Sequence, residues 1–164
     1  MKKENRLITA ALPYVNNIPH LGNIVGSHLP ADIFARYCKL NGYNSAFIGG
    51  TDEHGTPIEV AAIKNNTTPK KLADFYYNKH KEINDWFNFS YDNFSRTSKE
   101  IHHKTVQEFF KKVYDHGYIK EGYLETPYCK NDKIALADRY IEGTCPYCNY
   151  ENARGDQCEN CGKI

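Results

Sequence analysis

Residues 7–23, LITAALPYVNNIPHLGN, decide the fold because their hydrophobic spacing changes from that of a strand to that of a helix. Leu7–Leu12 is a short apolar run ended by a proline, which is typical of a buried parallel strand. From about Leu21 to Leu40 the apolar residues recur at helical spacing. Pro30 interrupts this pattern and predicts a kink or a break in the helix.

A second apolar run, Ser45–Ile48, follows a helix stop signal at Gly42 and ends at two glycines. A strand, a helix and a strand in this order predict a parallel crossover unit. We therefore expect an α/β fold with a Rossmann-like parallel sheet. The spacing further predicts helices at Ile58–Lys64 and Pro69–Phe87 with Thr68 as cap, a strand at Tyr91–Phe94, and a helix from a Thr97–Glu100 capping box to Gly117.

The composition and the hydrophobic spacing of the sequence change after Gly117. Short strand-like pieces, Tyr118–Lys120 and Tyr123–Thr126, lead into sequence rich in Gly, Cys and Asn without a long helical pattern. We expect two domains, residues 1–117 and residues 118–164.

The composition is that of a folded protein without a membrane segment. Of the 164 residues, 40% are hydrophobic and 13% aromatic, which argues against disorder. No apolar run is long enough to span a bilayer, and no signal peptide pattern is present, so the sequence predicts a cytoplasmic protein that does not contact a membrane. The net charge of +1 lacks the basic excess of many nucleic-acid binders, so we expect any RNA contact to come from a local patch or from protein outside these 164 residues.

Four of the six cysteines form two C-x-x-C pairs, Cys145 with Cys148 and Cys158 with Cys161. Two residues between cysteines allow both thiolates to face one side of a tight turn, and two such turns complete a tetrahedral zinc shell. Gly155 and Gly162 are expected to supply backbone freedom for these turns. Disulfides, a redox C-x-x-C or iron in the same shell are the alternatives. A closed shell predicts a structural metal. Of the remaining cysteines, Cys38 is predicted to be a buried apolar residue, and Cys129 is not expected to be a ligand.

The start of the first helix is a candidate anion site. It follows a strand of a parallel sheet, where phosphates bind to the free N–H groups of a helix N-terminus. His20 and Asn23 are three residues apart and can face this site together, and Gly22 lets a flat ring approach the backbone. The alternative interpretation is that His20 and Asn23 only cap the helix.

These features resemble a known family. His20-Leu21-Gly22-Asn23 is similar to the "HIGH" signature of class I aminoacyl-tRNA synthetases, with Asn in place of the commoner final His. The longer stretches resemble methionyl-tRNA synthetases in particular, in the archaeal and eukaryotic style. The stretches that carry the resemblance are ALPYVNN at 11–17, Ala31-Asp32, GTDEHGTP at 50–57 and DRYIEGTCP at 138–146.

The resemblance implies a methionine–tRNA ligase, an enzyme of protein biosynthesis that converts methionine and ATP (with Mg²⁺) to methionyl-adenylate and then charges tRNA-Met. It implies that His20 and Asn23 are catalytic and, with Gly22, bind ATP. It also implies that Asp52 holds the methionine ammonium group, while Leu12 and Tyr14 line the side-chain pocket. The residues alone favour Asp52 as an N-cap of the next helix, and they leave Leu12 open as a core residue.

The resemblance further implies the first half of a class I catalytic domain, followed by the start of a connective-peptide domain with its zinc knuckle. No Lys-rich "KMSKS" loop and no anticodon-binding domain is present in the 164 residues, so the chain is expected to be an N-terminal fragment that is inactive alone. Other readings are a zinc deaminase, suggested by His80-Lys81-Glu82 ahead of a C-x-x-C, a zinc-ribbon module that recognises RNA or a partner, and a different class I synthetase.

Overall fold

The computed structural model describes residues 4–123, 125–137, 140–155 and 157–163. The chain divides into two compact units, Met1–Asp115 and His116–Ile164, which are described separately below. Among the described residues, no helix combines the length and the apolar character needed to cross a membrane.

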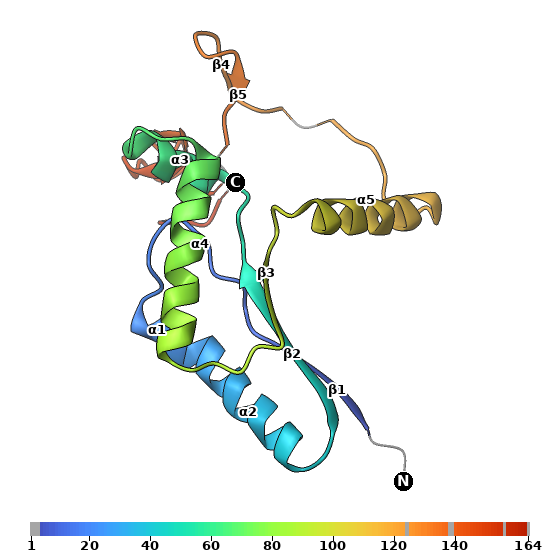
Figure 1. Ribbon diagram of the computed structural model, residues 1–164. Helices are drawn as coiled ribbons and strands as arrows, with labels where there is room; N and C mark the ends of the chain where they lie inside the picture. The colour runs from blue at the N-terminus through green and yellow to red at the C-terminus, as the bar shows by residue number, and fades with distance from the viewer. Residues whose placement is uncertain (1–3, 124, 138–139, 156, 164) are drawn as a thin grey trace. The chain divides into compact units, whose positions relative to one another are not determined.

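The first unit is built on a three-stranded parallel sheet of order β1-β2-β3, formed by β1 (Asn5–Thr9), β2 (Asn44–Thr51) and β3 (Asn93–Arg96). The predicted parallel β-α-β unit is therefore confirmed (Figure 1). β1 is shorter at its carboxyl end than predicted, since the N–H of Ala11 donates to Ser27 Oγ instead of a strand. β2 is longer than predicted because its last residues pair with β3.

The helix after β1 is continuous but changes type before Pro30. It consists of α1 (Leu21–Asn23), the π-helical turn η1 (Ile24–His28) and α2 (Leu29–Leu40). Proline lacks an N–H, and in a regular α-helix its ring would press on the carbonyl four residues earlier. The wider π turn accommodates Pro30 within the helix, so the predicted kink or break takes the form of a π segment. The helix ends as predicted at Gly42, whose φ is +76°.

Two apolar clusters hold the first unit together. α2 packs along β1 and β2 (Figure 1), and the cluster between them contains Ile8, Ala35, Cys38 and Phe47. A second cluster lies where α3 (Thr56–Lys64) meets α4 (Pro69–Trp86), and it includes Val15 from the loop after β1. Cys38 is thus a buried core residue, as predicted.

The capping box predicted at Thr97 is wrong. The last long helix, α5, spans Glu100–Asp115, so Thr97 lies three residues before its start. The hydroxyl of Thr97 instead accepts a hydrogen bond of 2.9 Å from the backbone N–H of Glu53. None of the residues of α5 is buried, and the helix leads away from the sheet in Figure 1.

The second unit contains two short antiparallel hairpins. β4 (Tyr128–Cys129) pairs with β5 (Ile134–Ala135), and β6 (Glu142–Gly143) pairs with β7 (Ala153–Arg154). Residues 118–120 form no strand, and neither do Tyr123, Glu125 and Thr126 of the second predicted piece. Leu124 lies outside the described residues.

Candidate functional site

The segments that follow β1 and β2 lie side by side beyond the carboxyl end of the sheet. Tyr14 and Asp52 form an isolated parallel bridge, in which the Asp52 N–H donates to Pro13 O at 2.8 Å and the Val15 N–H donates to Asp52 O at 3.3 Å. Leu12 joins them, because its Cδ2 lies 3.6 Å from the point where a Cβ on Gly50 would stand. The three residues assigned to methionine by resemblance therefore share one edge of the sheet.

Asp52 does not cap the next helix. The N-cap of α3 is Gly55, whose φ of +106° favours glycine, and α3 has no side-chain cap bond. The half-buried carboxylate of Asp52 makes only one hydrogen bond within the described residues, at the 3.5 Å limit, to the N–H of His54. The capping alternative for Asp52 is therefore wrong, and its carboxylate retains acceptor capacity.

A buried carboxylate next to Asp52 fixes this segment in place. The Glu53 side chain is 0% exposed and accepts hydrogen bonds from Thr51 Oγ1 at 2.8 Å, from Arg96 Nε at 2.7 Å and from Ser98 Oγ. Arg96 also pairs with Asp74 of α4 at 2.6 Å. The sequence does not reveal the role of Arg96, because its partners Asp74 and Glu53 are 22 and 43 residues away and no local pattern marks them.

His20 and Asn23 cap the first helix reciprocally. Asn23 N–H donates to His20 Nδ1 at 3.3 Å, and His20 N–H donates to Asn23 Oδ1 at 3.1 Å. An imidazole that accepts at Nδ1 carries its proton on Nε2 when neutral. The cap therefore uses one acceptor of each side chain and leaves a donor on each, Nε2–H of His20 and Nδ2–H₂ of Asn23. Both residues are exposed.

Gly22 is needed for this arrangement. A Cβ added there would lie 2.9 Å from His20 Cε1 and 3.0 Å from His20 Nδ1. Gly22 thus makes room for the folded-back imidazole, a role that the sequence did not indicate. The loop before His20 is held in addition by α4, where buried His80 forms a 3.2 Å hydrogen bond through Nε2 to the carbonyl oxygen of Asn17.

The four predicted cysteines come together in the second unit through two turns with the same hydrogen bonds. Cys145 O accepts from Asn149 N–H at 2.9 Å, and Cys158 O accepts from Gly162 N–H at 2.8 Å. The N–H of Cys145 donates to Tyr150 O, and the N–H of Cys158 donates to Lys163 O, five residues later and at 2.9 Å in both turns. The residue after each second cysteine, Asn149 or Gly162, has φ of +59° or +70°.

The sulfur positions suit a tetrahedral metal. The four Sγ atoms lie within 4.8 Å of one another, with 3.8 Å between Cys145 and Cys161 and 3.6 Å between Cys148 and Cys158. Zn–S bonds of about 2.3 Å in a tetrahedron separate two sulfurs by about 3.8 Å. A disulfide would require about 2.05 Å. The spacing therefore fits a Cys₄ metal shell and does not fit disulfides.

The thiols are also unequal in acidity. Hydrogen bonds from the Asn160 side chain and from the Tyr150 backbone lower the pKa of Cys148 to about 6. The Lys163 backbone hydrogen bond lowers the pKa of Cys161, but burial and the neighbouring thiols outweigh it and raise that pKa to about 11. Several sulfurs this close resist sharing negative charge, and a divalent cation would remove that conflict by replacing the protons.

One detail of the knuckle differs from expectation. Gly162 has the expected left-handed backbone, but the equivalent residue of the other turn is Asn149, not Gly155. A Cβ on Gly155 would stand 3.0 Å from the Ile141 side chain, so glycine is required there for packing. Cys129 stays outside the four-cysteine group, and its Sγ donates to Asp132 Oδ2 at 3.1 Å.

The comparisons with known proteins identify the family. Residues 6–164 match the family described as tRNA synthetases class I (M). The chain belongs to this family. This class I synthetase chain is 52% identical to the cytoplasmic methionine–tRNA ligase of Arabidopsis thaliana over 164 residues, which are 99% of this chain and 21% of that protein. It is 54% identical to the methionine–tRNA ligase of Saccharolobus solfataricus over 162 residues, 96% of this chain and 28% of that protein.

A solved structure supports the same fold. Mycobacterium tuberculosis methionyl-tRNA synthetase in complex with methionyl-adenylate matches with a TM-score of 0.70 at 25% identity, over 99% of this chain and 30% of that one. The synthetase chain thus spans roughly a fifth to a third of the proteins it matches. The deaminase reading fails, because the four-cysteine group includes neither His80 nor Glu82. Of the residues that carried the resemblance, Asp138 and Arg139 lie outside the described residues.

Proposed function

We propose that this chain carries part of the active site of a methionine–tRNA ligase, the part that binds ATP and the methionine ammonium group. The observation that supports it is the Tyr14–Asp52 bridge beyond the carboxyl ends of two parallel strands, in the same connection after β1 that leads to the capped helix start at His20. Ligands of such sheets bind beyond the carboxyl ends of the strands.

In the proposed reaction, a methionine carboxylate oxygen bonds to the α-phosphorus of ATP and the bond to pyrophosphate breaks. This transfer asks the protein for positioning and for charge stabilisation. His20 Nε2–H and Asn23 Nδ2–H₂ would donate to phosphate oxygens as charge grows on the leaving pyrophosphate. Gly22 would contribute to ATP binding by letting the His20 imidazole fold back against the helix start. Mg²⁺ would accompany the ATP phosphates.

Asp52 would pair with the methionine ammonium group. Its carboxylate is half-buried and lightly hydrogen-bonded, whereas Glu53 beside it is fully occupied by Arg96 and its hydroxyl partners. Leu12 and Tyr14 are each about half exposed, at 46% and 47%, and lie on the same edge. An aromatic ring suits a polarizable thioether, so these two side chains would border the methionine side chain.

The four cysteines would hold one structural Zn²⁺. A shell filled by protein ligands has no open position for a reacting water. We further propose that the second unit begins the connective-peptide domain, that tRNA-Met is the final acceptor, and that the protein works in the cytoplasm, the compartment in the name of the Arabidopsis relative. Transfer to tRNA and full activation would require the regions of the family that lie beyond these 164 residues.

The decisive test is binding of a non-hydrolysable methionyl-adenylate analogue. Calorimetry measures the affinity, and NMR detects the response of the His20 imidazole resonances. Asp52→Asn should weaken binding by about 2–4 kcal/mol, the range for a truncated buried charge pair. Asp85→Asn is the matched control, since exposed Asp85 on α4 loses the same charge away from the site. The proposal fails if Asp52→Asn and Asp85→Asn bind the analogue alike, or if the His20 resonance does not respond to it.

A further inference from the structure

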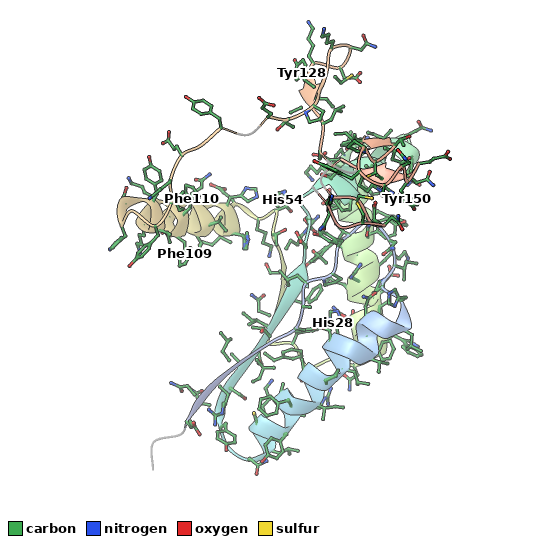
Figure 2. All side chains as sticks on the ribbon, turned by 180° about the vertical axis from the view of Figure 1, so that it is seen from behind. His28, His54, Phe109, Phe110, Tyr128 and Tyr150 are labelled. Carbon is green, nitrogen blue, oxygen red and sulfur yellow. The ribbon has the colours of Figure 1, made fainter. Side chains whose placement is uncertain are left out.

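A pair of exposed histidines lies outside the proposed active-site residues and outside the knuckle. His54, in the turn after β2, and His103, in the first turns of α5, bring their Nε2 atoms within 3.1 Å of each other. Their ring planes are tilted by 44° and the centroids are 5.2 Å apart, so the rings meet at their nitrogen edges and are not stacked. Figure 2 shows His54 next to the start of α5.

The separation of the two nitrogens is that of a chelating pair. Zn–N bonds of about 2.0–2.1 Å in a tetrahedral shell place two ligand nitrogens about 3.3 Å apart. The observed distance of 3.1 Å differs from that by a few tenths of an ångström. In the metal-free pair one imidazole donates its Nε2–H to the other. Metal binding requires only that this donor move its proton to Nδ1, so no net proton is lost from the neutral pair.

The two segments that carry the pair are held together by hydrogen bonds to one buried residue, Glu53. Glu53, the neighbour of His54, donates its N–H to Thr97 Oγ1, and its carboxylate accepts from Arg96 and Ser98. These partners lie just before α5, which carries His103. The segments that carry the two histidines are therefore connected by the ion pair between Arg96 and the unexposed carboxylate of Glu53. A site fixed in this way loses little freedom when it binds.

From this juxtaposition we propose that His54 and His103 form a second metal site, distinct from the cysteine knuckle, for a divalent ion of the zinc type. Imidazole ligands suit Zn²⁺ and its late first-row neighbours. Among the residues that the structure describes, no third His, Cys, Asp or Glu completes a cluster with the pair. The remaining coordination positions are therefore open to water or to an anionic ligand, unlike those of the knuckle.

The test is titration of Zn²⁺ into the 164-residue chain that already holds one zinc at the cysteines, by calorimetry up to about 1 mM free metal. A second equivalent should bind, and both His54→Gln and His103→Gln should weaken its binding at least about tenfold, the lower end of the loss that is typical when a residue supporting a metal ligand is replaced. His102→Gln is the matched control on the same turn of α5. Circular dichroism of each variant checks that the fold is kept.

Each outcome decides the proposal. Loss in both pair variants with retention in His102→Gln supports a chelate. Loss in only one of the two variants indicates binding to a single imidazole and overturns it, as does equal loss in His102→Gln. Absence of a second equivalent in the unchanged chain overturns it as well. The first equivalent at the cysteines reports separately on the knuckle, so failure here leaves the proposed function unaffected.

Discussion

Replacing Gly22 with alanine tests whether the His20 ring is held in place by the space that glycine provides. A new Cβ would stand 2.9 Å from His20 Cε1, whereas carbon atoms normally meet at about 3.5 Å. The imidazole must then move by roughly half an ångström. The bond from Asn23 N–H to His20 Nδ1 is already 3.3 Å long, so this movement takes it beyond hydrogen-bond range.

Two opposing terms set the size of the effect. Alanine is favoured over glycine in a helix by about 0.5–1 kcal/mol, whereas loss of a side-chain N-cap costs about 0.5–2 kcal/mol. Gly26 is the matched control, because a Cβ there meets nothing within 4 Å. We expect Gly26→Ala to raise the free energy of unfolding by roughly 0.5–1 kcal/mol. The free energy of unfolding of Gly22→Ala should be about 1 kcal/mol lower than that of Gly26→Ala.

Urea denaturation followed by circular dichroism gives the two free energies of unfolding, and the imidazole resonances of His20 report the ring position. The His20 resonances should shift in Gly22→Ala and stay in place in Gly26→Ala. Equal stabilisation by the two substitutions, with an unshifted His20 ring in both, would refute the reasoning.

Three further predictions concern the rest of the molecule. Chelation of zinc should abolish the ordered structure of residues 140–155 and 157–163, which is measurable as loss of amide dispersion there, since zinc contributes roughly 10–16 kcal/mol to such sites. Persistence of the fold would refute a structural metal. Burial lowers the pKa of both His28 and His80 below 6.5, so the native state keeps them neutral while the unfolded chain takes up protons. The free energy of unfolding should be full above about pH 7 and should fall as pH decreases below the unfolded value of 6.5, until the lowered native pKa values are reached; His80→Gln should reduce that slope in urea titrations. Glu53→Gln should destabilise the first unit by about 3–5 kcal/mol, because Arg96 loses its buried partner, whereas Glu82→Gln on the surface of α4 should change the urea midpoint little.

The elements that the sequence predicted correctly depend on local patterns. Two apolar runs joined by a helical repeat specify the parallel pair β1–β2, and two C-x-x-C turns specify the sulfur cluster. In both, the residues that decide the structure are close together in the sequence.

The features that the sequence missed depend on contacts between distant segments. Thr97 has the chemistry of a helix cap, but the N–H of Glu53, 44 residues earlier, takes its hydroxyl. Gly155 looks like a turn glycine, but it is small because Ile141 packs against it. Cap propensity and glycine freedom are weak local terms, and a tertiary hydrogen bond or a packing contact of similar size outweighs them.

A capping role and a catalytic role for His20 and Asn23 do not exclude each other. A cap requires acceptors, because the free groups at a helix start are N–H donors. A phosphate site requires donors. Imidazole and carboxamide side chains each have one acceptor and at least one donor, so the same pair can satisfy both demands at once. Aspartate or serine at position 23 would cap as well, but aspartate would bring a negative charge to the proposed phosphates. Asn23 therefore has the groups that both roles require, because its Oδ1 accepts the capping bond and its Nδ2–H₂ group is not used by it.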